Sequence, residues 1–348
     1  MSLLRESALP LLRTMGVDPY QRRHKREAER ILKSIEEERG PLSQSISRQC
    51  DAYAGDVLGG KEYAPWLHVY SAIAGEFREG WIPDNFYGKK VIPHIKGQYG
   101  ALSNLNAMNT ILFGVDHFPD VLYLVKGRFY NCNREETALG DVANALFAEH
   151  EKVVLKLDGY SQGRGIAFFD RSTFDADAVS RLGDGVFQSF IDQHARLAAI
   201  SSSHAVSTLR ITTVLKANVP EVRASYLRLG AGSDTHIRSA THIRVPVSAP
   251  TGRLSEFGYT TKWKRISQHP ESEIEFSSIV YPVFAKVCSI VKTLHAEIPY
   301  VHCIGWDVCV DKSGNVQIIE WNGVHNDIKF GEATQGPCFA DLEWQQFA

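Results

Sequence analysis

Near the end of the sequence, a short polar segment separates two strand-like stretches. Val308 and Val310 alternate with polar neighbours, and a second strand-like stretch follows at residues 317–321. The residues between them, 311–315, are turn formers, and Gly314 can adopt a positive φ. This pattern predicts a β-hairpin with a tight turn.

The carboxylates of Asp307 and Glu320 and the amide of Asn322 fall at one end of this hairpin. Hard oxygen ligands of this kind suit Mg²⁺, which keeps its other positions for water and phosphate oxygens. An ordinary surface hairpin with acidic ends gives the same pattern, so the hairpin alone leaves both interpretations open. Asn326 and Asp327, which follow it, are further candidates to line such a site.

A second strand–loop–strand pattern spans residues 152–169. Its loop contains Gly159, Gly163 and Gly165, and glycines let backbone amides come close to an anion. Lys156 precedes the loop on the strand, where its ammonium group can meet a phosphate. No apolar helix pattern follows directly, which excludes a Walker A loop and a Rossmann turn. The pattern is typical of a flexible flap over a nucleotide, or of a glycine-rich turn beside a surface lysine.

Arg210 lies in the middle of a β-branched stretch, residues 207–214, that is suited to a central strand of a sheet. An arginine should not be buried there without a partner. Either a carboxylate pairs with it, or it faces a cleft that binds anions. Further along, a polar and basic stretch at 230–244 is interpreted as a loop that favours an acidic or phosphorylated substrate, or as a plain solvated loop.

Helical periodicity is clearest in residues 22–39, a charged amphipathic stretch that ends at Gly40. An apolar pattern over 276–298 predicts a helix that packs against a sheet. Three further patterns predict a strand beginning at residue 65, a helix over 99–112 and a helix over 135–149.

The length, charge and cysteine content of the chain exclude several classes of protein. The 348 residues suffice for two or three subdomains. With 38 basic and 40 acidic residues the net charge is −2, which argues against a dedicated nucleic-acid binder. No apolar run approaches the roughly 18 residues that span a bilayer, and the start of the sequence lacks a secretory signal pattern. The 6 cysteines are scattered without metal-site spacing. We expect a cytoplasmic protein with reduced cysteines and no membrane span.

The glycine loop and the hairpin, in this order, resemble the ATP-grasp superfamily. The resemblance is closest to the sugar-transfer-associated ATP-grasp proteins, which are related to α-L-glutamate ligases. It extends from about Val121 to Asn326 and includes the apolar strand at 186–191 and the strand around Arg210. It implies an α+β fold of the ATP-grasp type, in which two α+β subdomains clasp ATP between them. The expected parts are an N-terminal helical or mixed subdomain (1–118), a lid subdomain (119–187) and a C-terminal subdomain with the metal hairpin (188–348).

The resemblance also implies roles for individual residues. Lys156 and Arg210 are expected to act on the phosphates in catalysis. Lys126 is expected to be a first phosphate-binding lysine, although a surface lysine at a strand end would look the same. The residues expected to bind Mg²⁺, for which Mn²⁺ is a substitute, are Asp307, Glu320 and Asn322. The residues expected to bind the nucleotide are Lys126, Lys156, Gly163, Arg164, Gly165, Gln188, Phe190, Ile191, Asp192 and His194.

With such a site, the resemblance implies an ATP-dependent carboxylate–amine ligase. A substrate carboxylate attacks the γ-phosphate of ATP, and an amine takes up the resulting acylphosphate to give an amide, ADP and phosphate. The expected setting is natural-product or cell-surface glycan and peptide biosynthesis. Two alternatives use the same residues: a small-molecule or sugar kinase, and a non-catalytic nucleotide-binding protein. The acid and amine substrates are not identified, and the oligomeric state is open, with a homodimer as one option.

Overall fold

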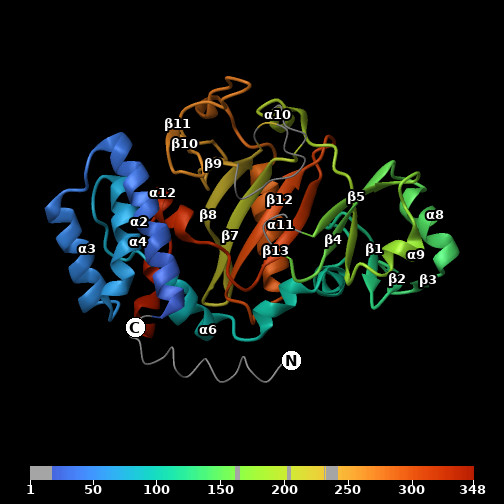
Figure 1. The fold of residues 1–348 in the computed structure, drawn as a ribbon, viewed down its shortest axis with the longest axis horizontal. Coiled ribbons are helices and arrows are strands. Elements are labelled where there is room, and N and C mark those ends of the chain that lie inside the picture. Colours follow the sequence, from blue (N-terminus) through green and yellow to red (C-terminus); the bar gives the residue numbers. More distant parts are fainter. Residues whose placement is uncertain (1–17, 161–164, 202–204, 231, 233–241) are drawn as a thin grey trace. The chain divides into compact units, whose positions relative to one another are not determined.

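The computed structural model describes residues 18–160, 165–201, 205–230, 232 and 242–348 (Figure 1). The chain forms two compact units. The helical unit comprises the described residues up to Pro93 together with Lys262–Lys264 and Asp327–Ala348, and the sheet unit comprises those of His94–Thr261 and Arg265–Asn326. The three-part division expected from the sequence stays a prediction.

In the helical unit, helix α2 (Pro19–Arg39) starts where Asp18 caps it. The Asp18 side chain accepts a hydrogen bond from the Tyr20 N–H at 2.9 Å. Gly40, with φ 85°, ends the helix, so the helix predicted over 22–39 is confirmed. Further helical segments in the described part of this unit are α3 (Gln44–Asp56), η1 (Lys61–Tyr63), α4 (Ala64–Ala74), α5 (Asp84–Phe86), η2 (Tyr87–Val91), α12 (Lys329–Gln335), η7 (Ala340–Leu342) and η8 (Trp344–Phe347).

Helix α4 occupies the stretch in which the sequence predicts a strand beginning at residue 65. Trp66, Leu67, Val69 and Tyr70 are all fully buried, so this helix is apolar on nearly every side. A run of this kind has no distinct helical period, and a buried strand has the same composition. The predicted strand is therefore wrong.

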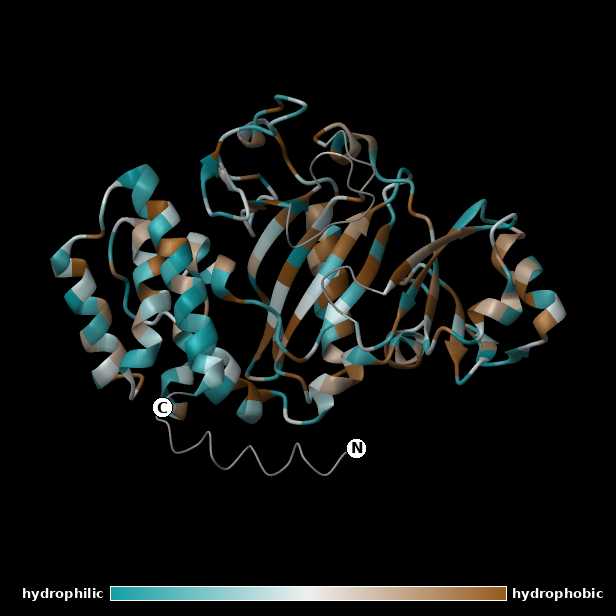
Figure 2. Cartoon of the chain, in the orientation of Figure 1, coloured by the Kyte–Doolittle hydropathy of each residue, from teal (hydrophilic) through white to brown (hydrophobic). Residues whose placement is uncertain are grey.

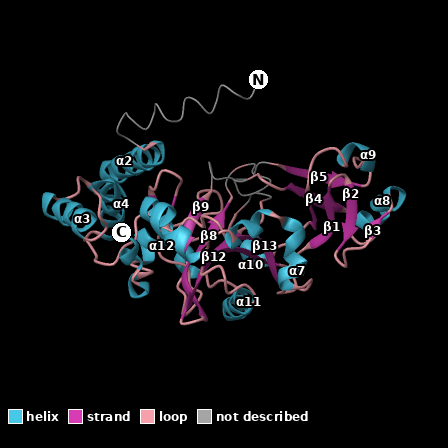
Figure 3. Cartoon of the chain, turned by 90° about the horizontal axis from the view of Figure 1, so that it is seen from below, coloured by secondary structure: helices cyan, strands magenta, loops and turns pink. Residues whose placement is uncertain are grey.

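The described residues of the sheet unit form two antiparallel sheets, drawn as magenta strands in Figure 3. The six-stranded sheet has the order β3-β2-β1-β6-β4-β5. On one of its faces Leu122, Leu155 and Phe187 share a core with helix α8 (Val142–Phe147). Its strands are β1 (Asp120–Val125), β2 (Arg128–Asn131), β3 (Glu136–Thr137), β4 (Lys152–Leu157), β5 (Ile166–Asp170) and β6 (Gly185–Ser189).

The seven-stranded sheet has the order β11-β10-β9-β8-β7-β12-β13. One face packs against helix α11 (Phe284–Ala296), and Leu209, Ile211 and Trp306 belong to this core. Apolar and polar positions alternate along these strands (Figure 2), so polar side chains gather on the opposite face. Its strands are β7 (Thr208–Lys216), β8 (Val219–Leu229), β9 (Ile243–Pro246), β10 (Gly258–Tyr259), β11 (Arg265–Ile266), β12 (Cys303–Val310) and β13 (Val316–Asn322).

Helix boundaries differ from the predicted ones where the backbone leaves the helical region. Helix α11 begins at Phe284 because Val283 has a positive φ of 48°. The helix predicted over 99–112 is broken at Leu105, which has φ −113° and ψ 89°. Further short helical segments in or beside the sheet unit are α6 (Ile92–Ile95), η3 (Tyr99–Asn104), η4 (Asn106–Met108), α7 (Asn109–Phe113), η5 (Leu139–Asp141), α9 (Ala176–Val179), α10 (Ala195–Ala198) and η6 (Phe276–Ser278).

Helices and antiparallel sheets make this an α+β protein, as the sequence predicts. The six cysteines are free thiols. No helix in the described part of the chain is long and apolar enough to cross a membrane.

Candidate functional site

Strands β12 and β13 form the predicted hairpin. Asp307 lies directly opposite Glu320, and Gly305 lies opposite Asn322. The side chains of Asp307, Glu320 and Asn322 therefore project from the same face of the seven-stranded sheet. The carboxylate of Asp311 accepts backbone hydrogen bonds within the turn at 2.9 and 2.8 Å, which stabilises the reversal of the chain.

Asp307 is the centre of a buried ion-pair cluster. Arg210 on β7 donates from Nε to Asp307 Oδ1 at 2.5 Å and from Nη2 to Oδ2 at 3.0 Å. Arg228 on β8 reaches the same Oδ2 through its Nη2 at 2.5 Å. Burial by itself favours the protonated acid, but the two guanidinium groups hold the pKa of Asp307 below its ordinary value. Of the two partners that the sequence left open for Arg210, the structure shows a carboxylate.

Strand register gathers arginines on this polar face. Arg210 lies opposite Asp307 on one side and Tyr226 on the other. Two residues after Tyr226 on β8, Arg228 lies opposite Arg244 on β9. Because strand side chains alternate between faces, Arg210, Arg228 and Arg244 share the face of Asp307. Arg244 ends the basic stretch at 230–244 that the sequence shows, whereas Arg228 lies before it. The alignment of the two residues depends on strand pairing, which cannot be read from the sequence.

Glu320 and Asn322 provide the remaining oxygens of the predicted metal site. The Glu320 side chain reaches solvent, whereas Asp307 is buried. Desolvation by the surrounding protein and then the charge of Asp307 raise the pKa of Glu320, and Arg210 opposes this shift. Asn322 is half-buried, and its Nδ2 donates to the carbonyl oxygen of Gly305 at 3.4 Å.

The chemistry of this donor set fits Mg²⁺, which prefers carboxylate and amide oxygens. Both oxygens of Asp307 already accept hydrogen bonds from guanidinium groups, so Asp307 would share them with a cation. Within the described residues, no group of three or more His, Cys, Asp or Glu side chains is arranged to hold a metal. The predicted set differs from such a group because it contains two carboxylates and one amide. Its role as a metal site stays a prediction.

Lys156 approaches the hairpin from the six-stranded sheet. Its Nζ donates to the carbonyl oxygen of Ile319 at 3.2 Å, next to Glu320. Burial lowers the pKa of Lys156, and the charges of Glu320 and Asp120 oppose this shift. Gln188 donates from Nε2 to Asp120 at 2.7 Å and to the same Ile319 carbonyl at 3.4 Å. The structure therefore brings Lys156 and Gln188 to the hairpin, together with Asp120, which no sequence motif singled out.

The other predicted nucleotide contacts lie just after strand β6. Phe190 is exposed and Ile191 is half-buried. Asp192 forms an ion pair with Lys312 at 2.9 Å. The side chain of His194 accepts a backbone N–H of helix α10 at 3.2 Å and so caps that helix. The roles of these residues toward adenine and ribose stay predictions.

Gly163 and Arg164 of the predicted flap lie outside the described residues. Gly165 has φ 69°, and a Cβ there would lie 2.7 Å from the ring of Tyr160, so this position requires glycine. Lys126 is exposed at the tip of the β1–β2 hairpin with φ 50°. Within the described part of the chain, no hydrogen bond or ion pair joins its side chain to the other site residues. Its phosphate-binding role stays a prediction.

A buried lysine supports the cluster. Lys96 Nζ donates to the carbonyl oxygen of Val324 at 2.7 Å and to Oδ1 of Asn326 at 2.9 Å. The carbonyl oxygen of Asn326 in turn accepts from Arg210 Nη1 at 3.2 Å. A Cβ at Gly305 would lie 2.8 Å from the Cβ of Asn326, so the segment is tightly packed. Asn326 thus positions Arg210. Lys96 lies in no recognisable motif, so the sequence offered no signal for it.

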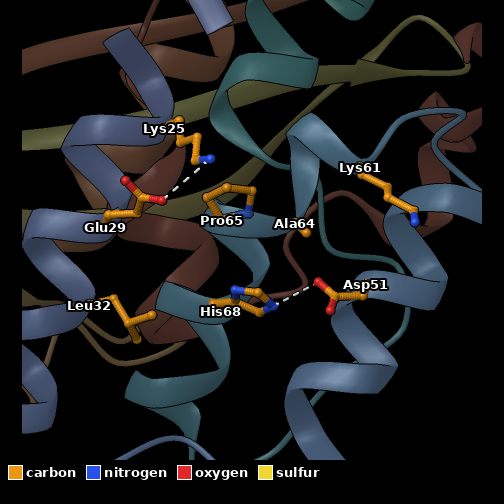
Figure 4. A pocket seen from close by; sticks show the side chains of 8 residues that line it. All are labelled: Lys25, Glu29, Leu32, Asp51, Lys61, Ala64, Pro65 and His68. Carbon is orange, nitrogen blue, oxygen red and sulfur yellow. Dashed lines mark ion pairs between the residues drawn. The ribbon is translucent and has the colours of Figure 1, made fainter. Parts of the chain in front are cut away.

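The helical unit carries a surface hollow of about 230 Å³ (Figure 4). Lys25 pairs with Glu29 at 3.7 Å, and His68 pairs with Asp51 at 3.1 Å. These charges balance one another close to solvent. The hollow therefore offers no concentration of charge for a phosphate or a metal ion, and the hairpin remains the candidate site.

Comparison with solved structures finds several that are similar to this chain. The D-cycloserine synthetase DcsG has 13% sequence identity and a TM-score of 0.43, with 73% of each chain covered. The ATP-grasp ligase PsnB has 11% identity and a TM-score of 0.41, with 72% of this chain and 62% of that chain covered. The D-alanine-D-alanine ligase from Coxiella burnetii has 10% identity and a TM-score of 0.40, with 72% and 59% covered. The chain thus spans less than two thirds of the length of PsnB and of the D-alanine-D-alanine ligase. No curated protein matches the sequence.

Residues 178–338 match the model of the family described as Sugar-transfer associated ATP-grasp. The matched segment contains Arg210, Asp307, Glu320 and Asn322, whereas Lys156 precedes it. The family resemblance expected from the sequence is confirmed.

Proposed function

We propose that this chain, which resembles the sugar-transfer associated ATP-grasp family over residues 178–338, is an ATP-dependent carboxylate–amine ligase. One observation carries the proposal: Lys156 of one sheet reaches the backbone beside Glu320 of the other, and Arg210 lies on the Asp307 carboxylate opposite Glu320. Phosphoryl transfer needs cationic side chains at the phosphates and carboxylates for the accompanying cation. This arrangement supplies both in one place.

Lys156 and Arg210 bind the terminal phosphates and stabilise the charge that develops on them during transfer. Arg210 can exchange the Asp307 carboxylate for a phosphate, because Arg228 continues to compensate the charge of Asp307. Asp307, Glu320 and Asn322 would hold Mg²⁺, which neutralises phosphate charge when bound.

In the proposed reaction, an oxygen of the acid attacks the γ-phosphorus of ATP, and the bond from that phosphorus to the bridging oxygen breaks. ADP leaves with the electron pair, and an acylphosphate forms. The amine nitrogen then attacks the acyl carbon, the bond to the phosphate oxygen breaks, and the nitrogen loses a proton. The proposed setting of this reaction is natural-product or cell-surface glycan and peptide biosynthesis, and the association of the matched family with sugar transfer supports it.

The test is to incubate the full-length chain with ATP and Mg²⁺ and a pooled set of amino acids, small peptides and amino sugars. ADP and free phosphate are quantified, and products are identified by mass spectrometry. Equal amounts of ADP and phosphate together with a new amide mass are expected. The Glu320→Gln variant is the matched control, because it keeps the size of the side chain and removes its charge.

Two outcomes contradict the ligase proposal. ADP without free phosphate, accompanied by a phosphorylated product, makes the protein a kinase. Binding of Mg–ATP without any turnover over the whole pool makes it a nucleotide-binding protein. Equal turnover by wild type and Glu320→Gln would overturn the assignment of the site.

A further inference from the structure

Asp120 lies at the start of strand β1, where the six-stranded sheet meets the β12–β13 hairpin. It is paired with Gln188 on β6, which in turn is paired with Val154 on β4. Lys156 is two residues further along β4, so Asp120, Gln188 and Lys156 share one face of this sheet. The opposite face carries the core with helix α8. Both Gln188 and Lys156 reach from the polar face to the carbonyl oxygen of Ile319 on the hairpin.

One oxygen of the Asp120 carboxylate holds the amide of Gln188. Gln188 Nε2 donates to Asp120 Oδ1 at 2.7 Å and to the Ile319 carbonyl at 3.4 Å, and the same carbonyl accepts from Lys156 Nζ at 3.2 Å. Gln188 is buried, so its amide depends on these protein partners rather than on water. The negative charge of Asp120 also attracts the ammonium group of Lys156. Asp120 therefore fixes the group that shares an acceptor with Lys156.

The other oxygen of the Asp120 carboxylate leads to strand β13. Oδ2 accepts from the hydroxyl of Tyr123 at 2.8 Å and from Asn109 Nδ2 at 3.4 Å. The Oδ1 of Asn109 accepts in turn from Trp321 Nε1 at 3.2 Å. Trp321 is buried and stands between the two predicted metal ligands of β13. The carboxylate is thus connected both to the lysine on one sheet and to the strand that carries the metal ligands on the other.

A main-chain contact strengthens this connection. The N–H of Ile318 donates to the carbonyl oxygen of His117 at 2.7 Å, so the segment that leads into Asp120 lies along β13. Lys156 and the hairpin belong to different sheets, and contacts of this kind set the distance between the lysine and the metal ligands. That distance matters, because a shift of about 1 Å in a catalytic group can cost roughly 100-fold in rate.

We propose that Asp120 is a positioning residue that holds the ammonium group of Lys156 against the β12–β13 hairpin. The inference rests on the proposed ligase function and adds a residue to its site. Asp120 acts through Lys156 and not on the substrate: one carboxylate oxygen orients Gln188 beside the lysine, and the other ties the same sheet to β13. A residue that only stabilised the fold would affect nucleotide binding equally with and without Lys156, whereas a positioning residue loses its effect when the ammonium group is removed.

The experiment is a double-mutant cycle of Asp120→Asn and Lys156→Met in the full-length chain. Isothermal titration measures the affinity for a non-hydrolysable ATP analogue with Mg²⁺. Asp120→Asn keeps the size of the side chain and removes its charge and one acceptor oxygen. It should weaken binding roughly fivefold in the wild-type background and less than about twofold in the Lys156→Met background. An equal loss in both backgrounds, or no loss in the wild-type background, overturns the proposal.

Asp170→Asn is the matched control. Asp170 ends strand β5 of the same sheet, and its carboxylate accepts backbone hydrogen bonds from Ser172 and Thr173 in its own turn, at 2.9 Å each. This variant should leave the affinity unchanged in both backgrounds. If Asp120→Asn fails to fold by circular dichroism, Asp120→Glu replaces it, because it keeps the charge and shifts the carboxylate by one methylene group. The same dependence on Lys156 is expected.

The cycle also separates this inference from the proposed function. Absence of nucleotide binding in the wild type overturns the proposed function. An affinity that Lys156→Met leaves unchanged removes Lys156 as a phosphate ligand, and the positioning role of Asp120 falls with it. Nucleotide binding that depends on Lys156, with losses from the two substitutions that simply add, overturns the role of Asp120 alone.

Discussion

Arg210 and Asp307 face each other on adjacent strands and form a two-point ion pair, with Nε–Oδ1 at 2.5 Å and Nη2–Oδ2 at 3.0 Å. They are 97 residues apart in the chain, and antiparallel pairing of β7 with β12 makes them neighbours. Both residues belong to the proposed catalytic site, and both are buried in the sheet. A change at either residue should therefore affect both the stability of the fold and the proposed activity.

Asp307→Asn should destabilise the protein as well as stop turnover. The neutral amide leaves Arg210 and Arg228 buried without their counter-charge, and removal of one partner from a buried ion pair costs about 3–5 kcal/mol. Urea denaturation at pH 7 measures the loss. Asp192→Asn, which removes an exposed ion pair with Lys312, is the control and should change stability little. An unfolding free energy equal to that of the wild type would contradict the structural role of Asp307.

Glu320→Gln should reduce turnover without reducing stability. Its side chain reaches solvent, and the neutral glutamine removes a charge that the folded state disfavours, so the unfolding free energy at neutral pH should not fall below that of the wild type. Turnover should fall by roughly 100-fold or more if Glu320 binds the cation. Steady-state kinetics at saturating Mg–ATP measures this.

Through Glu320, the stability of the wild type should fall as pH rises. The folded state raises the pKa of Glu320, so between the unfolded and folded pKa values the folded chain binds more protons, and its stability declines as pH rises. Glu320→Gln should remove that decline. A variant with full activity, or with the same decline in stability, would disprove the assignment.

Lys156→Met should weaken binding of Mg–ATP by roughly tenfold or more, which is a loss of about 1.4 kcal/mol. The methionine keeps the length of the apolar stem and removes the ammonium group that reaches the hairpin. Lys152→Met is the matched control, because it lies on the same strand but is exposed. Isothermal titration with a non-hydrolysable ATP analogue compares the two, and identical affinities would exclude Lys156 as a phosphate ligand.

Lys96 should make stability rise with pH in the alkaline range. Burial lowers its pKa from 10.5 to about 8. Between these values the unfolded chain binds more protons than the folded chain, so the unfolding free energy increases with pH by up to about 3 kcal/mol. Lys96→Met should abolish this increase. Denaturation of both proteins at pH 7, 8, 9 and 10 gives the difference, and parallel curves would show that Lys96 stays charged.

The part of the site that sequence could predict is the part made by local patterns. The β12–β13 hairpin followed from strand patterning around a polar turn, and its residues Asp307, Glu320 and Asn322 are neighbours through pairing between sequence-adjacent strands. The need of Arg210 for an anion followed from the cost of a buried charge. Its actual partner, Asp307, could not be predicted, because the order of the strands decides which carboxylate lies opposite Arg210.

Other features depended on tertiary context. Helix α4 lacks a polar face and was mistaken for a strand, since burial on all sides removes the period that distinguishes them. The alignment of Arg228 with Arg244 required the register of β8 and β9. Lys96 contacts Val324 and Asn326 from more than two hundred residues away, and no local pattern marks such a residue.

The contact between Lys156 and the carbonyl oxygen of Ile319 spans 163 residues, and it has a consequence for biosynthesis. A ribosome produces Lys156, Arg210 and Arg228 well before it produces Asp307 and Glu320. During that interval the arginines have no carboxylate from the hairpin, so we expect them to stay hydrated until the hairpin can cover them. The proposed nucleotide site can therefore be complete only after β12 and β13 have been translated. On the proposed function, ATP would stabilise the finished chain and would not guide the folding of its earlier segments.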